Sequence, residues 1–264
     1  MKNSTLYSEN IVGLIPAAGK ATRLGKIPFS KELFPIGFEE KEGDQRPKTV
    51  SSYLIDQMAD AGIKSIHYVI RKDKWDIPNY YGGGKEHNIS ICYQIADYSY
   101  CVPFSINQAY PFIKDKTIAL GFPDIIIKPR NVFNQLIKKL NSNVETDFVL
   151  GMFPSNLEII KDEMDIIGNR TKNHYLNNKK DKNLNFTWII AIWRPTFTKF
   201  LNKYLENLVN SYTETELLKN ECQLSDILAA AISNDLISEY VFFENGDHID
   251  IGIAERLVKA RTFL

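Results

Sequence analysis

The chain has 264 residues, of which 44% are hydrophobic and 24% charged, as is usual for a soluble globular protein. Basic and acidic residues number 32 each, so the formal net charge is zero, and nothing in this balance indicates a nucleic-acid or membrane partner. Three widely separated cysteines without metal-ligand spacing are typical of a reduced cytoplasmic protein, and no apolar run approaches the roughly 20 residues that cross a membrane.

Residues 1–10 are polar and predict a short leader before the folded chain, since they lack the apolar core of a signal peptide. The apolar run 11–15 predicts the first buried strand. A long charged loop is expected over 20–44. A helix is then predicted over 49–61, where apolar side chains recur on one face, and a strand over 65–70. This order of strand, helix and strand is typical of a right-handed βαβ unit.

The rest of the chain continues the alternation of strands and helices. Strands are predicted over 89–95, 117–122, 147–153, 186–193, 240–243 and 248–251, and helices over 129–140, 197–208, 224–232 and 254–260. Residues 169–185, of which ten are Asn or Lys, predict an exposed hairpin or loop rather than a linker. The alternation predicts a single domain over 11–262, built as a three-layer, mostly parallel α/β sheet.

The end of the first strand carries the first chemical signal. Small residues, Ala18 and Gly19, are followed by two basic ones, Lys20 and Arg23. Small residues leave backbone N–H groups bare, and such groups cradle phosphate oxygens while lysine and arginine add positive charge. The stretch therefore predicts a nucleotide-phosphate site. A dinucleotide-binding oxidoreductase is not indicated, because the segment lacks the later glycines of Gly-x-Gly-x-x-Gly.

A resemblance to a known family extends this interpretation. The segment 19–23, Gly-Lys-Ala-Thr-Arg, resembles the Gly-x-Gly-Thr-Arg loop of the nucleotidylyltransferases that activate sugar phosphates, with Ala21 in place of the second glycine. Lys31, in the sequence Ser-Lys-Glu-Leu-Phe-Pro, resembles the lysine that precedes a Leu-Pro step in the same family.

This resemblance implies a Rossmann-like nucleotidyltransferase sheet, with residues 11–125 as the nucleotide-binding half and 126–262 as the acceptor-binding half. It implies catalytic roles for Arg23, which would stabilise the leaving pyrophosphate, and for Lys31, which would stabilise the transferring group. The nucleotide-binding residues that it implies are Ala18, Gly19, Lys20, Ala21 and Thr22.

Two aspartates correspond to the metal ligands of the family. Asp124 follows the fourth predicted strand, and Asp250 lies in Asp-Ile-Gly-Ile-Ala-Glu just before the terminal helix. Taken alone, each is as well explained as a turn or cap residue. The resemblance implies that they jointly bind Mg²⁺, a hard cation that one or two carboxylates hold together with substrate phosphates.

Residues for the base and the acceptor are implied in the same way. Gln94 corresponds to the glutamine that reads the nucleobase. The lysine that meets the acceptor phosphate in the family has no direct counterpart, and Lys179 or Lys180 is its candidate substitute. Thr187 and Trp188 open a predicted strand and are candidate lining residues of the acceptor pocket, although core packing is the commoner role of a tryptophan.

The resemblance implies a magnesium-dependent enzyme that transfers a nucleotidyl group from a nucleoside triphosphate, dTTP or UTP in preference, to a sugar 1-phosphate. A cytidylyltransferase acting on a non-sugar phosphate such as phosphocholine is one alternative, and a non-catalytic nucleotide-sensing module on the same fold is another. A sensor would not need Arg23, Lys31, Asp124 and Asp250 together. The sequence leaves open whether the chain forms a homo-oligomer.

Overall fold

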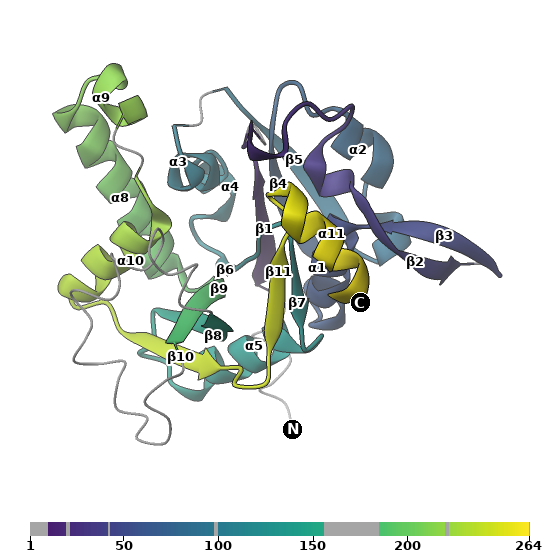
Figure 1. Ribbon diagram of the computed structural model, residues 1–264. Helices are drawn as coiled ribbons and strands as arrows, with labels where there is room; N and C mark the ends of the chain where they lie inside the picture. The colour runs from purple at the N-terminus through teal and green to yellow at the C-terminus, as the bar shows by residue number, and fades with distance from the viewer. Residues whose placement is uncertain are drawn as a thin grey trace.

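A seven-stranded sheet forms the centre of the molecule in the computed structural model, which describes residues 10–19, 22–41, 43–97, 100–155, 185–219 and 222–263. Its strands are β1 (Ile11–Ala17), β4 (Ser65–Arg71), β5 (Ser90–Ala96), β6 (Thr117–Leu120), β8 (Phe148–Ser155), β9 (Asn185–Trp193) and β10 (Ser238–Phe242). They lie in the order β10-β8-β9-β6-β1-β4-β5, and the neighbouring pairs are parallel except the two that involve β9. The prediction of a mostly parallel α/β sheet is confirmed (Figure 1).

The first strand, β1, is buried on both faces, as its apolar sequence predicts. Ile11 and Ile15 belong to one hydrophobic core, and Val12 and Leu14 belong to a second core on the opposite face, because alternate side chains of a strand point in opposite directions. β1 lies between β4 and β6, so the strand order reverses there. Ligands of open α/β sheets bind beyond the carboxyl ends of the strands at such a point.

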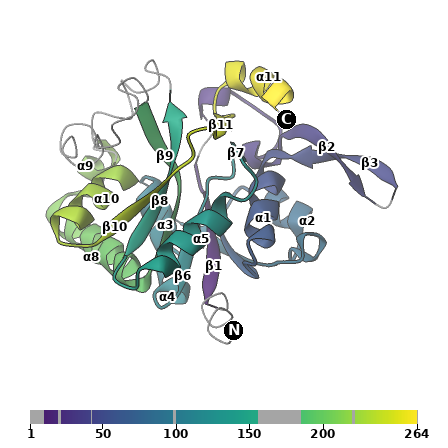
Figure 2. The same ribbon diagram turned by 90° about the horizontal axis from the view of Figure 1, so that it is seen from below.

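Helices cover both faces of the sheet and complete the three layers that the sequence predicts. Those that pack into the first core are α1 (Val50–Asp60), α2 (Asp76–Tyr81) and α5 (Val132–Ser142). Those that pack into the second core are α3 (Val102–Asn107), α4 (Tyr110–Ile113), α8 (Pro195–Ser211), α9 (Glu214–Lys219) and α10 (Leu224–Ser233). Seen from below, α8, α9 and α10 lie on one side of the sheet and α1 and α2 on the other (Figure 2).

The loop predicted over 20–44 contains regular structure. Two short 3-10 turns, η1 (Thr22–Leu24) and η2 (Lys31–Leu33), precede a hairpin of β2 (Pro35–Lys41) and β3 (Asp44–Thr49). Within β2 only Ile36 is buried, so no alternation of apolar residues marks the strand. The hairpin is held by its backbone ladder and by a tight turn at Gly43, whose φ of +87° favours glycine. The loop prediction is therefore wrong for this part of the segment.

A second small sheet joins two segments that are far apart in the chain. β7 (Ile125–Lys128), which the sequence analysis did not predict, pairs antiparallel with β11 (Asp247–Asp250), and α11 (Ala254–Phe263) follows β11. Ile126 and Ile249 from the two strands pack with Ile36 and Val50 in a third apolar cluster. This cluster fixes the C-terminal segment against the hairpin and the start of α1.

Asp56, on α1, joins the β2–β3 hairpin to the 3-10 turn η3 (Lys85–His87). Its carboxylate accepts hydrogen bonds from the Lys48 amine and, at 2.7 Å, from His87 Nδ1. Burial by itself raises the pKa of Asp56, but the hydrogen bonds from His87 and Lys48 outweigh it, and the pKa lies below its ordinary value. A lowered folded pKa means that this carboxylate stabilises the fold above about pH 3.9, and that the contribution is lost as the pH falls through the folded value.

Asp56→Asn is expected to lower the free energy of unfolding at pH 7 by about 1.5–3 kcal/mol, since charge-assisted hydrogen bonds are lost. The deficit should shrink as the pH falls below about 4, because the wild-type carboxylate is then being protonated. Urea unfolding at several pH values measures both effects. Asp60→Asn is the matched control, because Asp60 lies on the same helix in an exposed pair with Arg130. A deficit that is independent of pH would contradict the prediction.

Two predictions fall largely outside the described residues. The leader over 1–10 is described only at Asn10, and the segment 169–185 only at Asn185. The division into nucleotide-binding and acceptor-binding halves stays a prediction. None of the helices in the described part of the chain has the length and apolar character of a membrane span.

Candidate functional site

Lys31 and Asp124 meet beyond the carboxyl ends of the central strands. Lys31 begins η2, and Asp124 lies in the short connection from β6 to β7. The Lys31 amine forms an ion pair with Asp124 Oδ2, and both side chains are largely buried. Burial by itself lowers the pKa of Lys31, but the Asp124 carboxylate outweighs it, so the pKa of the amine lies above its ordinary value. The lysine is therefore a fixed positive charge at neutral pH.

Asp250 is brought next to Asp124 by the pairing of β7 with β11. Asp250 lies opposite Ile125 in this ladder, and the Ile251 N–H donates to the Asp124 carbonyl at 3.0 Å. Burial and the neighbouring Asp124 carboxylate both raise the pKa of Asp250 above its ordinary value. Two acidic groups thus share one small site with the Lys31 amine.

Further groups surround Asp250. Its Oδ1 accepts a 2.6 Å hydrogen bond from the Gly252 N–H, and Arg256 Nη1, from α11, lies 3.5 Å from its Oδ2. A Cβ at Gly252 would lie 2.8 Å from Asp250 Oδ1 and 3.4 Å from Arg23 Nη2, so a larger residue would displace the Asp250 carboxylate, and the Arg23 guanidinium lies close to this turn. The structure therefore places Lys31 and Arg256 at the two carboxylates and Arg23 at the adjoining Gly252 turn.

Arg256 was missed by the sequence analysis. It lies in the first turn of α11, soon after Asp250, and only the packing of that helix beside β11 directs it to the carboxylate. The signal that could have found it is the short spacing between an aspartate and an arginine across a strand-to-helix junction.

Of the residues that the sequence analysis assigns to a nucleotide-phosphate site, Ala18 and Gly19 directly follow β1. Ala18 is buried and Gly19 is exposed, with open space at the position of a Cβ. Thr22 begins η1, whereas Lys20 and Ala21 lie outside the described residues. Their nucleotide-binding role stays a prediction.

Gln94 lies within β5, two residues before the end of the strand. Its amide donates to His67 Nδ1 at 2.9 Å and to Cys92 Sγ at 3.2 Å, while its Oε1 is buried without a hydrogen-bond partner among the described residues. Burial lowers the pKa of His67, which keeps its ring neutral and able to accept this bond. The role of Gln94 in reading the base stays a prediction.

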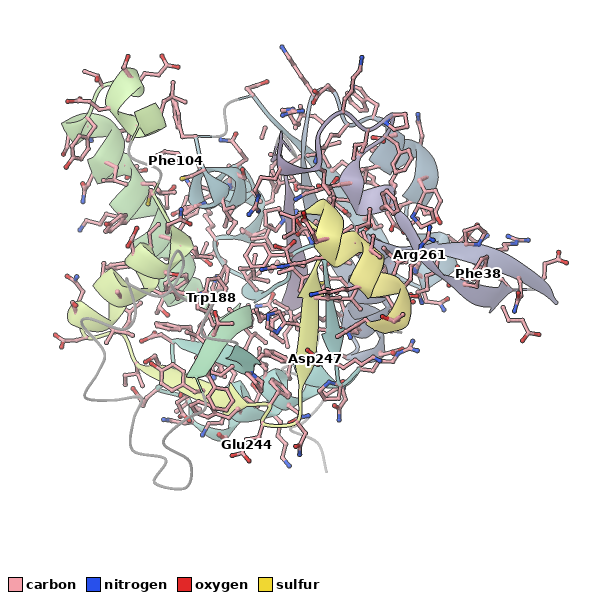
Figure 3. All side chains as sticks on the ribbon, viewed as in Figure 1. Phe38, Phe104, Trp188, Glu244, Asp247 and Arg261 are labelled. Carbon is pink, nitrogen blue, oxygen red and sulfur yellow. The ribbon has the colours of Figure 1, made fainter. Side chains whose placement is uncertain are left out.

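The structure describes two of the predicted acceptor-binding residues, Thr187 and Trp188. Thr187 and Trp188 lie on β9, and Trp188 is labelled in Figure 3. The Trp188 Nε1–H donates to Ser225 Oγ at 3.0 Å, and its ring centroid lies 5.9 Å from that of Phe122, two residues before Asp124. The tryptophan is therefore linked through one aromatic contact to the loop that carries Asp124. Lys179 and Lys180 lie outside the described residues.

The carboxylates of Asp124 and Asp250 suit a cation that prefers oxygen ligands. Among the described residues no group of three or more His, Cys, Asp or Glu side chains is placed to hold a metal ion. Asp124 and Asp250 provide carboxylate oxygens only, and two such groups suit a cation that takes its remaining ligands from water and phosphate. Asp124 already pairs with Lys31, so any cation would share this carboxylate with the lysine.

A cavity of about 460 Å³ lies elsewhere, between the β2–β3 hairpin and the end of α2. Its lining includes Leu33, Pro35, Thr49 and Tyr80, but none of the two carboxylates and three cations described above. We assign it no part in the chemistry of the site.

Comparisons with known proteins find matches to the fold of this chain but not to its sequence. No family model matches the sequence, and no curated protein matches it. Solved structures do match. A Bacillus anthracis protein described as a glucose-1-phosphate thymidylyltransferase, solved in complex with sucrose, has a TM-score of 0.71 at 14% identity, covering 96% of this chain and 94% of its own. A UDP-glucose pyrophosphorylase complexed with UDP-glucose has a TM-score of 0.67 at 17% identity, covering 96% and 97%. A UDP-glucose pyrophosphorylase from Acinetobacter baumannii has a TM-score of 0.65 at 14% identity, covering 95% and 92%.

The chain has the fold of the sugar-phosphate nucleotidylyltransferases. The resemblance that two short motifs indicated is thereby confirmed for the fold. On this nucleotidylyltransferase fold, the Lys31, Asp124 and Asp250 side chains lie at the carboxyl edge of the sheet, beside the strand where the order reverses.

Proposed function

We propose that the protein transfers a nucleotidyl group from a nucleoside triphosphate to a sugar 1-phosphate and releases pyrophosphate. The observation that carries this proposal is the meeting of Lys31, Asp124 and Asp250 at one edge of the sheet. The solved structures that share the fold are described as enzymes of this reaction class, which supports the same reaction here.

In the proposed reaction, an oxygen of the sugar phosphate attacks the α-phosphorus of the triphosphate. The bond from this phosphorus to the oxygen that bridges to the β-phosphorus breaks, and pyrophosphate leaves with that electron pair. A phosphate monoester is already largely ionised near neutral pH, so no general base is required. Because two anions must approach each other, positioning and charge neutralisation supply most of the catalysis.

The residues of the site suit these tasks. Lys31 is held as a cation by Asp124 and would stabilise the charge on the nucleotidyl group during its transfer. Arg23 lies close to the Gly252 turn and would stabilise the leaving pyrophosphate. Asp124 and Asp250 would hold Mg²⁺, which, when bound, supplies Lewis-acid neutralisation of phosphate charge.

The donor is proposed to be UTP or dTTP. One structure with the same fold is described as complexed with UDP-glucose and another as UTP-bound, and a third as a thymidylyltransferase. Uracil and thymine present the same hydrogen-bonding edge, so one side-chain amide is able to read either base. Gln94, whose Oε1 lacks a partner among the described residues, is the proposed amide.

The deciding experiment measures pyrophosphate release from dTTP, UTP, CTP, ATP and GTP, each with Mg²⁺ and each against sugar 1-phosphates and phosphocholine. Release from UTP or dTTP with one sugar 1-phosphate, abolished by a chelator, is the expected result. Release only from CTP with phosphocholine would assign the chain to the cytidylyltransferases. Nucleotide-induced stabilisation without release from any pair would favour a nucleotide sensor.

Lys31→Met is expected to lower kcat by about 100-fold, because one positive charge on the transferring group is lost while the aliphatic stem of the side chain is kept. Steady-state kinetics with the active substrate pair measure this change. Lys26→Met is the matched control, since Lys26 is an exposed lysine of the same loop. A kcat equal to that of the wild type would remove Lys31 from the catalytic site.

A further inference from the structure

Both neighbours of Lys31 in the chain are held by charged side chains from one segment, 72–76, which runs from the end of β4 to the first residue of α2. Asp76 holds Ser30. Its Oδ2 accepts the Ser30 backbone N–H at 2.6 Å, and its Oδ1 accepts the Ser30 hydroxyl at 2.7 Å. Asp76 Oδ1 also accepts the Ile77 N–H at 3.1 Å, so the carboxylate is itself fixed at the start of α2. The residue before Lys31 is thereby held at its backbone and its side chain.

The residue after Lys31 is held in a similar way. Glu32 Oε1 accepts a 2.7 Å hydrogen bond from the Lys74 amine, and the two side chains are 1% and 6% exposed. The Glu32 carbonyl accepts the Ser51 hydroxyl at 2.6 Å, which ties the same residue to the first turn of α1. The Glu32 backbone and side chain are therefore both anchored.

The buried ion pair between Glu32 and Lys74 is an inefficient way to gain stability. A buried ion pair loses much of its attraction to the cost of removing two charges from water, and apolar side chains of similar volume usually serve at least as well. Glu32 Oε2 has no hydrogen-bond partner among the described residues, which adds to that cost. Hydrogen-bonded charges differ from apolar contacts in being directional, so they define where a backbone lies more narrowly.

We propose that Asp76 and Lys74 are positioning residues, which hold Ser30 and Glu32 so that the Lys31 amine is kept at the Asp124 carboxylate. The inference rests on the proposed function for its catalytic meaning, whereas the positioning itself can be measured without turnover. A lysine amine at the end of a flexible stem keeps one location only if the backbone at its root is fixed. Catalysis by positioning is sensitive to the location of such an amine, because a displacement of about 1 Å costs up to about 100-fold in rate.

The first test measures the acetylation rate of individual lysines by acetic anhydride in metal-free buffer, using peptide mass spectrometry. In the wild type, Lys31 is protected by its ion pair with Asp124. In Asp76→Asn its rate is expected to rise several-fold toward that of Asp124→Asn, which removes the charge of the carboxylate that pairs with it. Lys48 is the internal reference, since it is also buried in an ion pair and lies outside the proposed positioning contacts. An unchanged Lys31 rate, or an equal rise at Lys48 from general loosening, would overturn the proposal.

Two further variants keep the test informative if Asp76→Asn folds poorly. Ser30→Ala removes only the hydroxyl that Asp76 accepts, and it should also raise the Lys31 rate. Asp73→Asn is the matched control, because Asp73 lies in the same segment but pairs with Arg71 at the surface, and it should leave the rate unchanged. A rise in Asp73→Asn equal to that in Ser30→Ala would also overturn the proposal.

The second test separates kcat from KM. Asp76→Asn is expected to lower kcat about tenfold and to change KM for the triphosphate little, because Lys31 acts on the transferring group. The double variant Glu32→Gln with Lys74→Met removes both charges at similar volume and should show the same pattern at a melting temperature near that of the wild type. Wild-type kcat in both variants would refute the inference, whereas a wild type without turnover on any substrate pair would refute the proposed function and leave the labelling result standing.

Discussion

Asp124→Asn is expected to lower kcat for pyrophosphate release by about 10³-fold or more while the protein stays folded. Asp124 has two roles in the proposed site, because its carboxylate pairs with the Lys31 amine and would also hold the cation. A neutral amide is a weaker ligand and a weaker partner for an ammonium group. Loss of charge neutralisation worth several kcal/mol accounts for a change of this size.

The fold should survive this substitution because it replaces a carboxylate by a group of the same shape. Lys31 also retains a neighbouring negative charge in Asp250, so the amine is not left without a counter-charge. Two measurements check the prediction: kcat with the active substrate pair, and the Mg²⁺-dependent rise in melting temperature in the presence of the nucleotide. Both should fall in the variant while the melting temperature without ligands stays close to the wild-type value.

Asp247→Asn is the matched control for this experiment. Asp247, labelled in Figure 3, begins the strand that ends in Asp250. Its side chain is exposed and accepts the local His248 N–H at 2.8 Å. The control should keep wild-type kcat. Full activity in Asp124→Asn, or an equal loss in Asp247→Asn, would remove Asp124 from the reacting site.

Lys74→Met is expected to cost about 3–5 kcal/mol of unfolding free energy, the largest stability effect that we predict. The substitution leaves the Glu32 carboxylate 1% exposed and without its cation. Removing one partner of a buried pair is costly because the other charge is left uncompensated. Arg130→Met is the matched control, since Arg130 pairs with Asp60 at the surface and should cost about 1 kcal/mol or less.

The pH dependence of Lys74→Met gives a more specific signature. Burial already raises the pKa of Glu32 in the wild type, although Lys74 opposes the rise. Without Lys74 the pKa of the folded state should rise further. A raised folded pKa means that this carboxyl does not lower the free energy of unfolding below its unfolded pKa of about 4.3. The loss of unfolding free energy grows as the pH rises from there through the folded pKa.

Urea unfolding between pH 4 and pH 8 therefore should show the wild type and Lys74→Met converging toward low pH. The double variant Glu32→Gln with Lys74→Met should lose this dependence, because no buried carboxyl remains at the position. A deficit in Lys74→Met that stays constant across the range would contradict the assignment of the loss to an uncompensated charge.

Local sequence patterns predicted the strands of the central sheet and the helices α1, α5, α8, α10 and α11, but not the shorter helices α2, α3, α4 and α9. The apolar runs that became β1, β4, β6 and β9, and the one-faced periodicity of α1, α5 and α8, are local properties of the chain. The hairpin β2–β3 and the strand β7 were not predicted, because their stability depends on backbone pairing and on contacts with distant segments. The strands β2 and β3 are largely polar, and β7 has only four residues, so none of the three carries enough periodicity to be recognised alone.

The assembly of the site depends on contacts between distant parts of the chain. Asp124 and Asp250 were singled out by a resemblance, but no local pattern shows that β7 and β11 pair and so bring the two carboxylates together. Arg256 and the contacts of Ser30 and Glu32 with Asp76 and Lys74 were not foreseen at all. The physical reason is that periodicity depends on neighbours within a few residues, whereas these contacts depend on strand order and register, which join parts of the chain that are far apart.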